Sequence, residues 1–329
     1  MEPARTQVSE ETLSCRYQGC SDICREGKEL CFWHDPDADK TSKDIAGRLE
    51  ELVELGRSLR GFQLQRANLE GIRLVRKGAD PSVDLSNANL YRANLRGAHL
   101  YCVDLRAANL LKADLAEANL NSSNMTGANL LGVRLTGSRI EHVEWGKRLY
   151  QEQQLLQRHL SNAEQCRSLY MEGEEVCRGI RQSCEAHGLF DVAGQFFHKE
   201  MLLRRKQYPL RSWQRWGSKL VDLLCGYGER PFRVFLFSSV LIVFCALLYG
   251  MFGLSMGDDI IRLESRASWA ANLSKFMDAL YFSAVTFTTL GYGDVTPVGF
   301  SRALAAAEAF LGNFTLALFV VVFVKKMTR

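Results

Sequence analysis

The 329-residue sequence lacks the residue combinations on which enzymes depend. It contains no phosphate-binding glycine-rich loop, no nucleophile beside a general base and no paired carboxylates of the catalytic kind. Of its six histidines, only His34 has metal-ligating residues nearby in the sequence. We therefore expect that the protein is not an enzyme.

The N-terminal residues also lack a secretory signal, because no charged segment is followed there by an apolar run. This absence predicts that the first 230 residues stay on the cytoplasmic side of any membrane that the chain crosses.

Long apolar runs are confined to the last hundred residues. Val234 to Leu254 contains 21 residues without a charge, and Ala303 to Val324 contains 22, interrupted only by Glu308. A helix needs about 20 apolar residues to cross about 30 Å of hydrocarbon. We therefore predict two membrane spans, at 232–254 and 301–325.

Basic residues flank both predicted spans on one side. Eight lie between 204 and 233, against Asp222 and Glu229, and Lys325, Lys326 and Arg329 follow the second span. By the positive-inside rule, both termini are expected in the cytoplasm of a multi-pass inner-membrane protein.

Between the spans lies a shorter apolar segment, SKFMDALYFSAVTFT, at 274–288. Since it is about half as long as a crossing requires, we expect a re-entrant helix whose end lines a watery path. In the residues that follow, TLGYG at 289–293, alternating glycines allow successive carbonyls to point the same way. Such carbonyls, with the Thr289 hydroxyl, can replace the water around a cation, provided that several copies converge.

The stretch TTLGYGD resembles the selectivity filter of potassium channels, whose usual signature is Thr-Val-Gly-Tyr-Gly. The layout of 229–329 resembles the two-transmembrane pore domain of prokaryotic channels. The resemblance implies a homotetramer in which K⁺ is the permeant ion and Asp294 lies at the extracellular mouth. It assigns K⁺ coordination to Thr289, Leu290, Gly291, Tyr292 and Gly293. Leu290 replaces the commoner valine, but its carbonyl would still coordinate.

One residue of the second span, Gly312, resembles the gating hinge of such channels. A small residue for close helix packing is an equal alternative.

A five-residue repeat occupies 61–145. Leucine or a similar residue recurs every fifth position from Leu85 to Ile140, with a small residue two positions earlier. Neither a helix nor a flat strand has this period. The repeat resembles the pentapeptide-repeat family, which implies a square right-handed parallel β-helix with four pentads per turn. Three earlier pentads are out of register by one residue, so RKGADPS at 76–82 is expected to bulge.

Two segments precede the repeat. Leucine and isoleucine spacing predicts a helix at 45–60 that caps the open end of the solenoid. Residues 1–44 hold a set of cysteines and one histidine that predicts a structural zinc site. The expected ligands are Cys15, Cys20, Cys31 and His34, with Cys24 as a spare or as a replacement for Cys20.

Residues 146–228 are expected to form an α-helical connector. Within it, 210–224 combines tryptophan, leucine and basic residues at helical spacing, which predicts a helix lying on membrane lipid. The predicted fold class is therefore a multidomain membrane protein with a β-helix, an α-helical connector and an all-α pore domain.

The function that we expect is passive, selective K⁺ permeation, regulated by the cytoplasmic part. A K⁺ transporter subunit and a membrane-tethered pentapeptide-repeat module that binds a partner are the alternatives. Residues 61–145 carry ten basic and eight acidic side chains, too few negative charges for a DNA mimic, and no nucleic-acid partner is expected. No voltage-sensor or nucleotide-binding pattern identifies the gating stimulus, so an unknown ligand or protein is left open.

Overall fold

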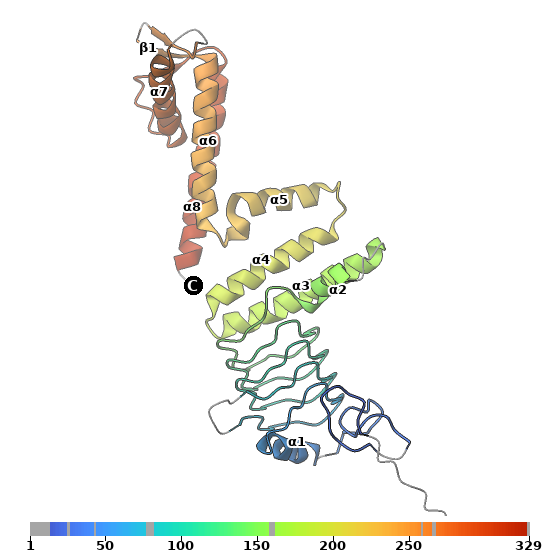
Figure 1. The fold of residues 1–329 in the computed structure, drawn as a ribbon. Helices are drawn as coiled ribbons and strands as arrows, with labels where there is room; N and C mark the ends of the chain where they lie inside the picture. Colours follow the sequence, from blue (N-terminus) through green and yellow to red (C-terminus); the bar gives the residue numbers. More distant parts are fainter. Residues whose placement is uncertain are drawn as a thin grey trace, which may run out of the picture. The chain divides into compact units, whose positions relative to one another are not determined.

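A computed structural model describes residues 14–24, 27–42, 44–76, 82–157, 162–257, 259–264 and 268–327. The chain divides into two compact units, Met1–Tyr208 and Pro209–Arg329 (Figure 1). The division falls inside the predicted 146–228 connector rather than at its end. Most of the expected RKGADPS bulge, at 77–81, lies outside the described residues.

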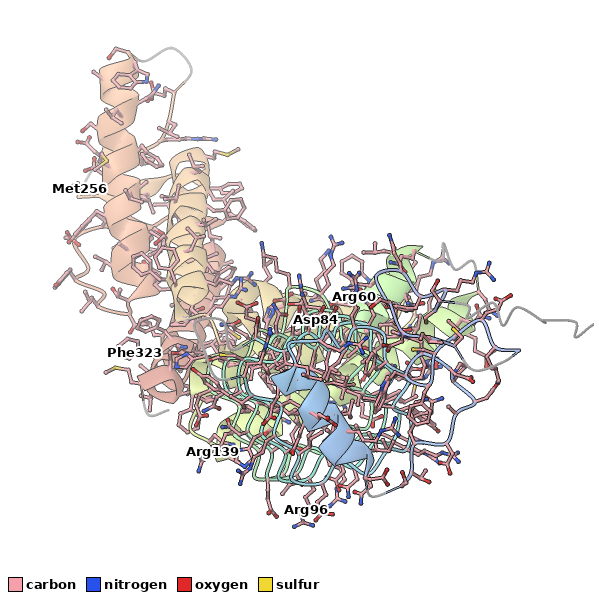
Figure 2. All side chains as sticks on the ribbon, turned by 60° about the horizontal axis from the view of Figure 1, so that its bottom comes forward. Arg60, Asp84, Arg96, Arg139, Met256 and Phe323 are labelled. Atoms are coloured by element: carbon pink, nitrogen blue, oxygen red, sulfur yellow. The ribbon has the colours of Figure 1, made fainter. Side chains whose placement is uncertain are left out.

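The repeat folds into a coil that closes every four pentads. Isolated parallel bridges join residues twenty positions apart, such as Asn89 to Asn109 and Asn109 to Asn129. The leucines and most of the small residues of the pentads are buried inside, while charged side chains such as Arg96 and Arg139 point outward (Figure 2). The period of five thus places the same residue type on the same side of each turn.

A ladder of side-chain amides runs along one face of the coil. Asn109 donates to Asn89 at 3.1 Å, and Asn89 donates to Gln63 at 3.0 Å. At the other end, Gln151 donates to Asn129 at 3.3 Å. Because each amide has both a donor and an acceptor, one residue type can extend the ladder from turn to turn.

Helix α1, Ile45–Glu54, covers the first turn of the coil with Ile45, Leu49 and Val53, all buried. The sequence predicted a helix to residue 60, but it ends six residues earlier. Gly56 takes a φ of +77°, and Leu59 is already part of the coil, with its N–H donating to the Asp84 carbonyl at 2.9 Å. Backbone pairing with the coil therefore replaces the last helical turn.

Three helices follow the coil: α2, Tyr150–Gln157; α3, Ala163–Ala186; and α4, Phe190–Gln207. The Asn162 side chain caps α3 by accepting from the Glu164 N–H at 2.9 Å. The Ser183 hydroxyl of α3 donates to the Leu135 carbonyl at 3.2 Å, which joins this helix to the last turns of the coil.

The second unit contains helices α5, Trp213–Cys225; α6, Pro231–Phe252; α7, Trp269–Phe287; and α8, Ser301–Met327. A short 3₁₀ turn, Gly226–Gly228, follows α5. Among the described residues, α6 and α8 are long and apolar enough to cross a membrane. Helix α7 lies beside them (Figure 1) and shares with them a core that includes Tyr249, Ala279 and Phe282.

The predicted re-entrant helix at 274–288 begins five residues earlier, at Trp269. The Ser268 hydroxyl accepts from the Ala271 N–H at 3.2 Å and caps the helix there. The longer helix brings α7 into contact with a short strand, Asp259–Ile261.

A small antiparallel sheet, which the all-α prediction missed, joins the helices at one end. Its strands are β1, Leu254–Met256; β2, Asp259–Ile261; and β3, Thr296–Pro297, in the order β2-β1-β3. Leu254 pairs with Ile261 on one side and with Pro297 on the other. Strands of two or three residues have too short an alternation to be recognised in a sequence.

Candidate functional site

The segment after α7 has an unusual alternating backbone. Thr289, Gly291 and Gly293 take positive φ values of +59°, +58° and +80°, and the residues between them do not. Such alternation turns successive peptide units so that their carbonyls can face one side, which a regular strand does not allow. Positive φ at Thr289 is uncommon for a residue with a side chain and marks local strain.

Backbone contacts with α7 fix where this segment begins. The Leu290 N–H donates to the Val285 carbonyl at 3.0 Å, and the Thr289 N–H donates to the Thr286 carbonyl at 3.0 Å. At the far end, the Tyr281 hydroxyl of α7 donates to Asp294 Oδ2 at 2.9 Å. Both ends of the 289–293 segment are thus attached to α7.

Side chains of the segment are largely exposed, Leu290 at 60% and Tyr292 at 67%. The five residues that the resemblance assigned to K⁺ coordination form one continuous segment, 289–293, and their role as ligands stays a prediction.

Gly312 lies inside the continuous helix α8 and touches the end of α7. A Cβ atom at Gly312 would lie 2.2 Å from the Phe287 carbonyl oxygen and 3.1 Å from Phe287 Cα. Since Phe287 is the last residue of α7, α8 packs directly against the backbone that leads into the 289–293 segment. This is the geometry of close packing, and the hinge role of Gly312 stays a prediction.

Glu308 lies one turn before Gly312, and a polar group inside the second predicted span is expected to face protein or the pore rather than lipid. The structure buries it beside Tyr249 and Ser283, and all three side chains are at most 1% exposed. Glu308 therefore faces protein, as its position in a predicted span indicated, whereas the identity of its two neighbours could not be predicted from the sequence.

A second candidate site lies in the N-terminal unit. One ligand atom each from Cys15, Cys20, Cys31 and His34 lies within 4.8 Å of every other. Cys31 Sγ is 3.2 Å from His34 Nδ1 and 3.8 Å from Cys20 Sγ. Zinc–sulfur bonds of about 2.3 Å place tetrahedral ligands about 3.8 Å apart, so the four atoms have the spacing of a closed zinc site. Cys24 is buried but is not a member of this group.

A hydrogen bond on the far side of the imidazole orients His34 for such a site. His34 Nε2 lies 3.0 Å from the Arg60 carbonyl oxygen, which can only accept, so Nε2 carries the proton. Nδ1 then presents its lone pair to the sulfurs, as in structural zinc centres. Tyr17 stacks on the imidazole at 4.0 Å, and Phe62 meets it edge-on at 5.1 Å.

Burial favours the neutral forms of Cys31 and His34 when no cation is present. It raises the pKa of the Cys31 thiol to about 12 and lowers the pKa of His34 below its usual value. A bound cation would reverse the effect on the thiols, because a coordinating sulfur is deprotonated.

Residues 235–329 match the ion channel family, and residues 82–113 and 98–137 match pentapeptide repeats. The chain therefore combines a C-terminal ion-channel domain with a pentapeptide-repeat region. With its two apolar helices, the ion-channel domain marks the chain as a membrane protein. Both families are non-enzymatic, in agreement with the sequence analysis.

Curated relatives match a short part of the chain. Protein LctB of Geobacillus stearothermophilus is 51% identical over 57 residues, which are 17% of this chain and 42% of that protein. Two pore potassium channel a of Oryza sativa subsp. japonica is 48% identical over 48 residues, 14% of each chain. The chain thus spans less than half the length of these relatives.

Solved structures of pentapeptide-repeat proteins are also similar. HetL from the cyanobacterium Nostoc is 31% identical, with a TM-score of 0.15, over 27% of this chain and 51% of that one. QnrB1, a plasmid-mediated fluoroquinolone resistance protein, is 20% identical, with a TM-score of 0.20, over 29% and 55%. The four-pentad turn of the coil is shown by its own backbone bridges between residues twenty positions apart.

Proposed function

We propose that the chain is one subunit of a K⁺-selective channel through which K⁺ moves passively down its electrochemical gradient. The observation that carries the proposal is the alternating backbone of 289–293 at the end of α7. In the proposed site, the Thr289 hydroxyl and the carbonyls of Thr289, Leu290, Gly291, Tyr292 and Gly293 replace the hydration shell of K⁺. The bond from Tyr281 holds Asp294 at the outer mouth.

The proposed assembly is a homotetramer in the inner membrane. One wall of carbonyls cannot surround an ion, and four copies related by a rotation axis close the ring. The basic residues before α6 and after α8 support a cytoplasmic location for both termini.

The two alternatives make different predictions. A transporter subunit typically carries four pore units with degraded filters in one chain, whereas the ion-channel match here covers a single unit, 235–329. A membrane-tethered binding module would conduct no ions. Currents recorded from purified protein in planar bilayers under a K⁺ gradient distinguish the channel from both alternatives.

For the repeat region, the proposal is a right-handed parallel β-helix that serves as a rigid spacer or assembly module. Bridges between residues twenty positions apart support the four-pentad turn. Helix α1 and the segment that holds Cys15, Cys20, Cys31 and His34 cover the N-terminal end of the coil, which supports a stable end there. Through this module, an unidentified ligand or protein would regulate the pore.

A structural Zn²⁺ is the proposed occupant of the Cys15, Cys20, Cys31 and His34 site. All four positions of a tetrahedron are filled by protein, which favours a structural over a catalytic role. Because His34 bonds Arg60 at the start of the coil, the metal would hold the N-terminal segment on the first turn.

The Cys31→Ser variant is expected to lose this metal. Wild-type protein should carry about one zinc per subunit, since a closed site binds zinc tightly. The variant should carry almost none, because a serine hydroxyl is a poor zinc ligand. Elemental analysis of purified protein measures both values.

Cys24→Ser is the matched control for the zinc experiment. Cys24 is also buried in this segment, but it lies outside the four-ligand group, so the variant should keep its zinc. Wild-type protein without stoichiometric metal, or equal loss in both variants, contradicts the proposed site.

Helix α5 is the proposed contact with membrane lipid. The structure begins it at Trp213, after Pro209, and ends it before Gly226, which takes a φ of +55°. Four of its exposed apolar side chains share one face: Trp213 at 86%, Trp216 at 59%, Leu220 at 56% and Leu223 at 65%. Tryptophan on such a face favours the headgroup layer, and each nearby basic residue adds about 1 kcal/mol at an anionic surface.

A spin label at Trp213 is expected to contact lipid in reconstituted protein. A label at Gln214, an exposed polar residue about 100° around α5 from Trp213, should contact water instead. Collisional relaxation with oxygen and with a water-soluble reagent reports the two environments. If the Trp213 label is water-exposed or protein-buried, α5 does not lie on the membrane.

A further inference from the structure

The carboxyl group of Glu308 lies where α6, α7 and α8 meet. It is 1% exposed, and its neighbours Tyr249 of α6 and Ser283 of α7 are fully buried. The Cys245 thiol of α6 also reaches it. In the part of the chain that the structure describes, no basic side chain pairs with Glu308.

Hydrogen bonds connect these groups in a row. The Tyr249 hydroxyl donates to Glu308 Oε2 at 2.6 Å. Glu308 Oε1 forms a short hydrogen bond with Ser283 Oγ. Ser283 Oγ also lies 2.9 Å from the Ile242 carbonyl oxygen of α6.

The number of protons limits how this row can be arranged. A serine hydroxyl has one proton, and both the Ile242 carbonyl and a carboxylate can only accept. With an ionised Glu308, one of the two Ser283 contacts would therefore lack a hydrogen. With a neutral Glu308, its O–H donates to Ser283, Ser283 donates to Ile242, and Tyr249 donates to the remaining carboxyl oxygen.

Burial also favours the arrangement with a neutral Glu308. An ionised carboxylate without a cationic partner is costly in an apolar interior, and more so at membrane depth. The neutral arrangement satisfies every donor and leaves no net charge.

The hydrogen bonds among Tyr249, Glu308 and Ser283 lie close to the proposed filter. Ser283 precedes Phe287, the last residue of α7, by one helical turn, and Glu308 precedes Gly312 by one turn. Gly312 is the residue that touches the Phe287 backbone. The Glu308–Ser283 bond and the Gly312–Phe287 contact together hold the last turn of α7.

We propose that Glu308 is a neutral positioning residue that ties α7 to both apolar helices and so sets the position of the 289–293 segment. This inference rests on the proposed channel function. Glu308 itself need not touch the ion.

Infrared difference spectroscopy tests directly whether the Glu308 carboxyl group carries a proton. Wild-type protein minus Glu308→Gln should show the carbonyl band of a protonated carboxyl group, and carboxylate bands in its place would overturn the proposal. This readout does not require ion conduction. If wild-type protein lacks K⁺ selectivity but shows the band, the channel proposal fails and the neutral Glu308 stands.

Permeability measurements test the positioning role. Glu308→Gln should keep the K⁺/Na⁺ permeability ratio, because its amide donates to Ser283 and accepts from Tyr249. Glu308→Leu leaves the Tyr249 hydroxyl unpaired and removes the bond between Ser283 and α8, so it should lower the ratio about tenfold, equivalent to about 1.4 kcal/mol. If that variant does not assemble, Ser283→Ala should lower the ratio in the same direction, because it removes the bonds of α7 to Glu308 and Ile242 and keeps the Tyr249–Glu308 bond.

Thr315→Val is the matched control. Thr315 is buried on the same face of α8, but its hydroxyl donates to Leu311 of its own helix at 2.6 Å. The K⁺/Na⁺ permeability ratio of the Thr315→Val variant should equal that of wild type. A wild-type ratio in both Glu308→Leu and Ser283→Ala, or a Thr315→Val loss as large as theirs, would overturn the positioning role.

Discussion

Gly312→Ala is expected to abolish channel current. The new methyl group would lie 2.2 Å from the Phe287 carbonyl oxygen, a distance that real Cβ atoms do not reach, so α8 and the end of α7 must separate. Overpacking of this kind typically costs about 1–3 kcal/mol, and here it acts on the backbone two residues before Thr289. Single-channel recording and size-exclusion chromatography measure conduction and assembly.

Gly217→Ala provides the control for a glycine-to-alanine change inside a helix. Gly217 lies in α5, and a Cβ atom there meets nothing within 4 Å. The substitution should raise helix stability by up to about 1 kcal/mol and leave the current unchanged. Wild-type current in Gly312→Ala would show that α8 does not need close contact with α7.

Gly291→Ala is expected to remove K⁺ selectivity. Gly291 takes a φ of +58°, where a side chain costs about 1–2 kcal/mol, and the cost recurs in every subunit of the proposed tetramer. A backbone that relaxes to negative φ turns its carbonyl away from the others. The expected result is a lost or unselective current, measured as the reversal potential under a K⁺ gradient.

Gly257→Ala separates filter geometry from backbone strain in general. Gly257 has a similar φ of +62° in the turn between β1 and β2, and open space surrounds it. The Gly257→Ala variant should lose about as much stability as Gly291→Ala, yet its current should stay selective for K⁺. Equal loss of selectivity in both variants would mean that the 289–293 segment has no special role.

Local signals explain what could be predicted from the sequence. The period of five places Leu90, Leu95 and Leu100 inside the coil without knowledge of distant contacts. The TTLGYGD stretch is likewise contiguous, and its glycines imply the positive φ values that Gly291 and Gly293 show.

Features that depend on distant partners could not be predicted. The row through Tyr249, Ser283 and Glu308 joins three helices, and no spacing in the sequence encodes it. The choice of Cys20 over Cys24 depends on how the loop before Cys31 folds, because both spacings suit zinc. Helix α1 ends early because Leu59 pairs with Asp84, a residue on the next turn of the coil.

Reversal potentials of the purified full chain in planar bilayers test the central claim most directly. The two sides of the bilayer contain unequal K⁺ concentrations, and Na⁺ balances the charge. Under these conditions, a K⁺-selective pore brings the zero-current potential close to the K⁺ equilibrium potential. For a monovalent ion this potential is about 59 mV per tenfold gradient, as in the one-electron relation for redox couples. The account predicts that the potential follows the K⁺ gradient and ignores the Na⁺ gradient. A reversal potential that does not move with the K⁺ gradient would contradict it.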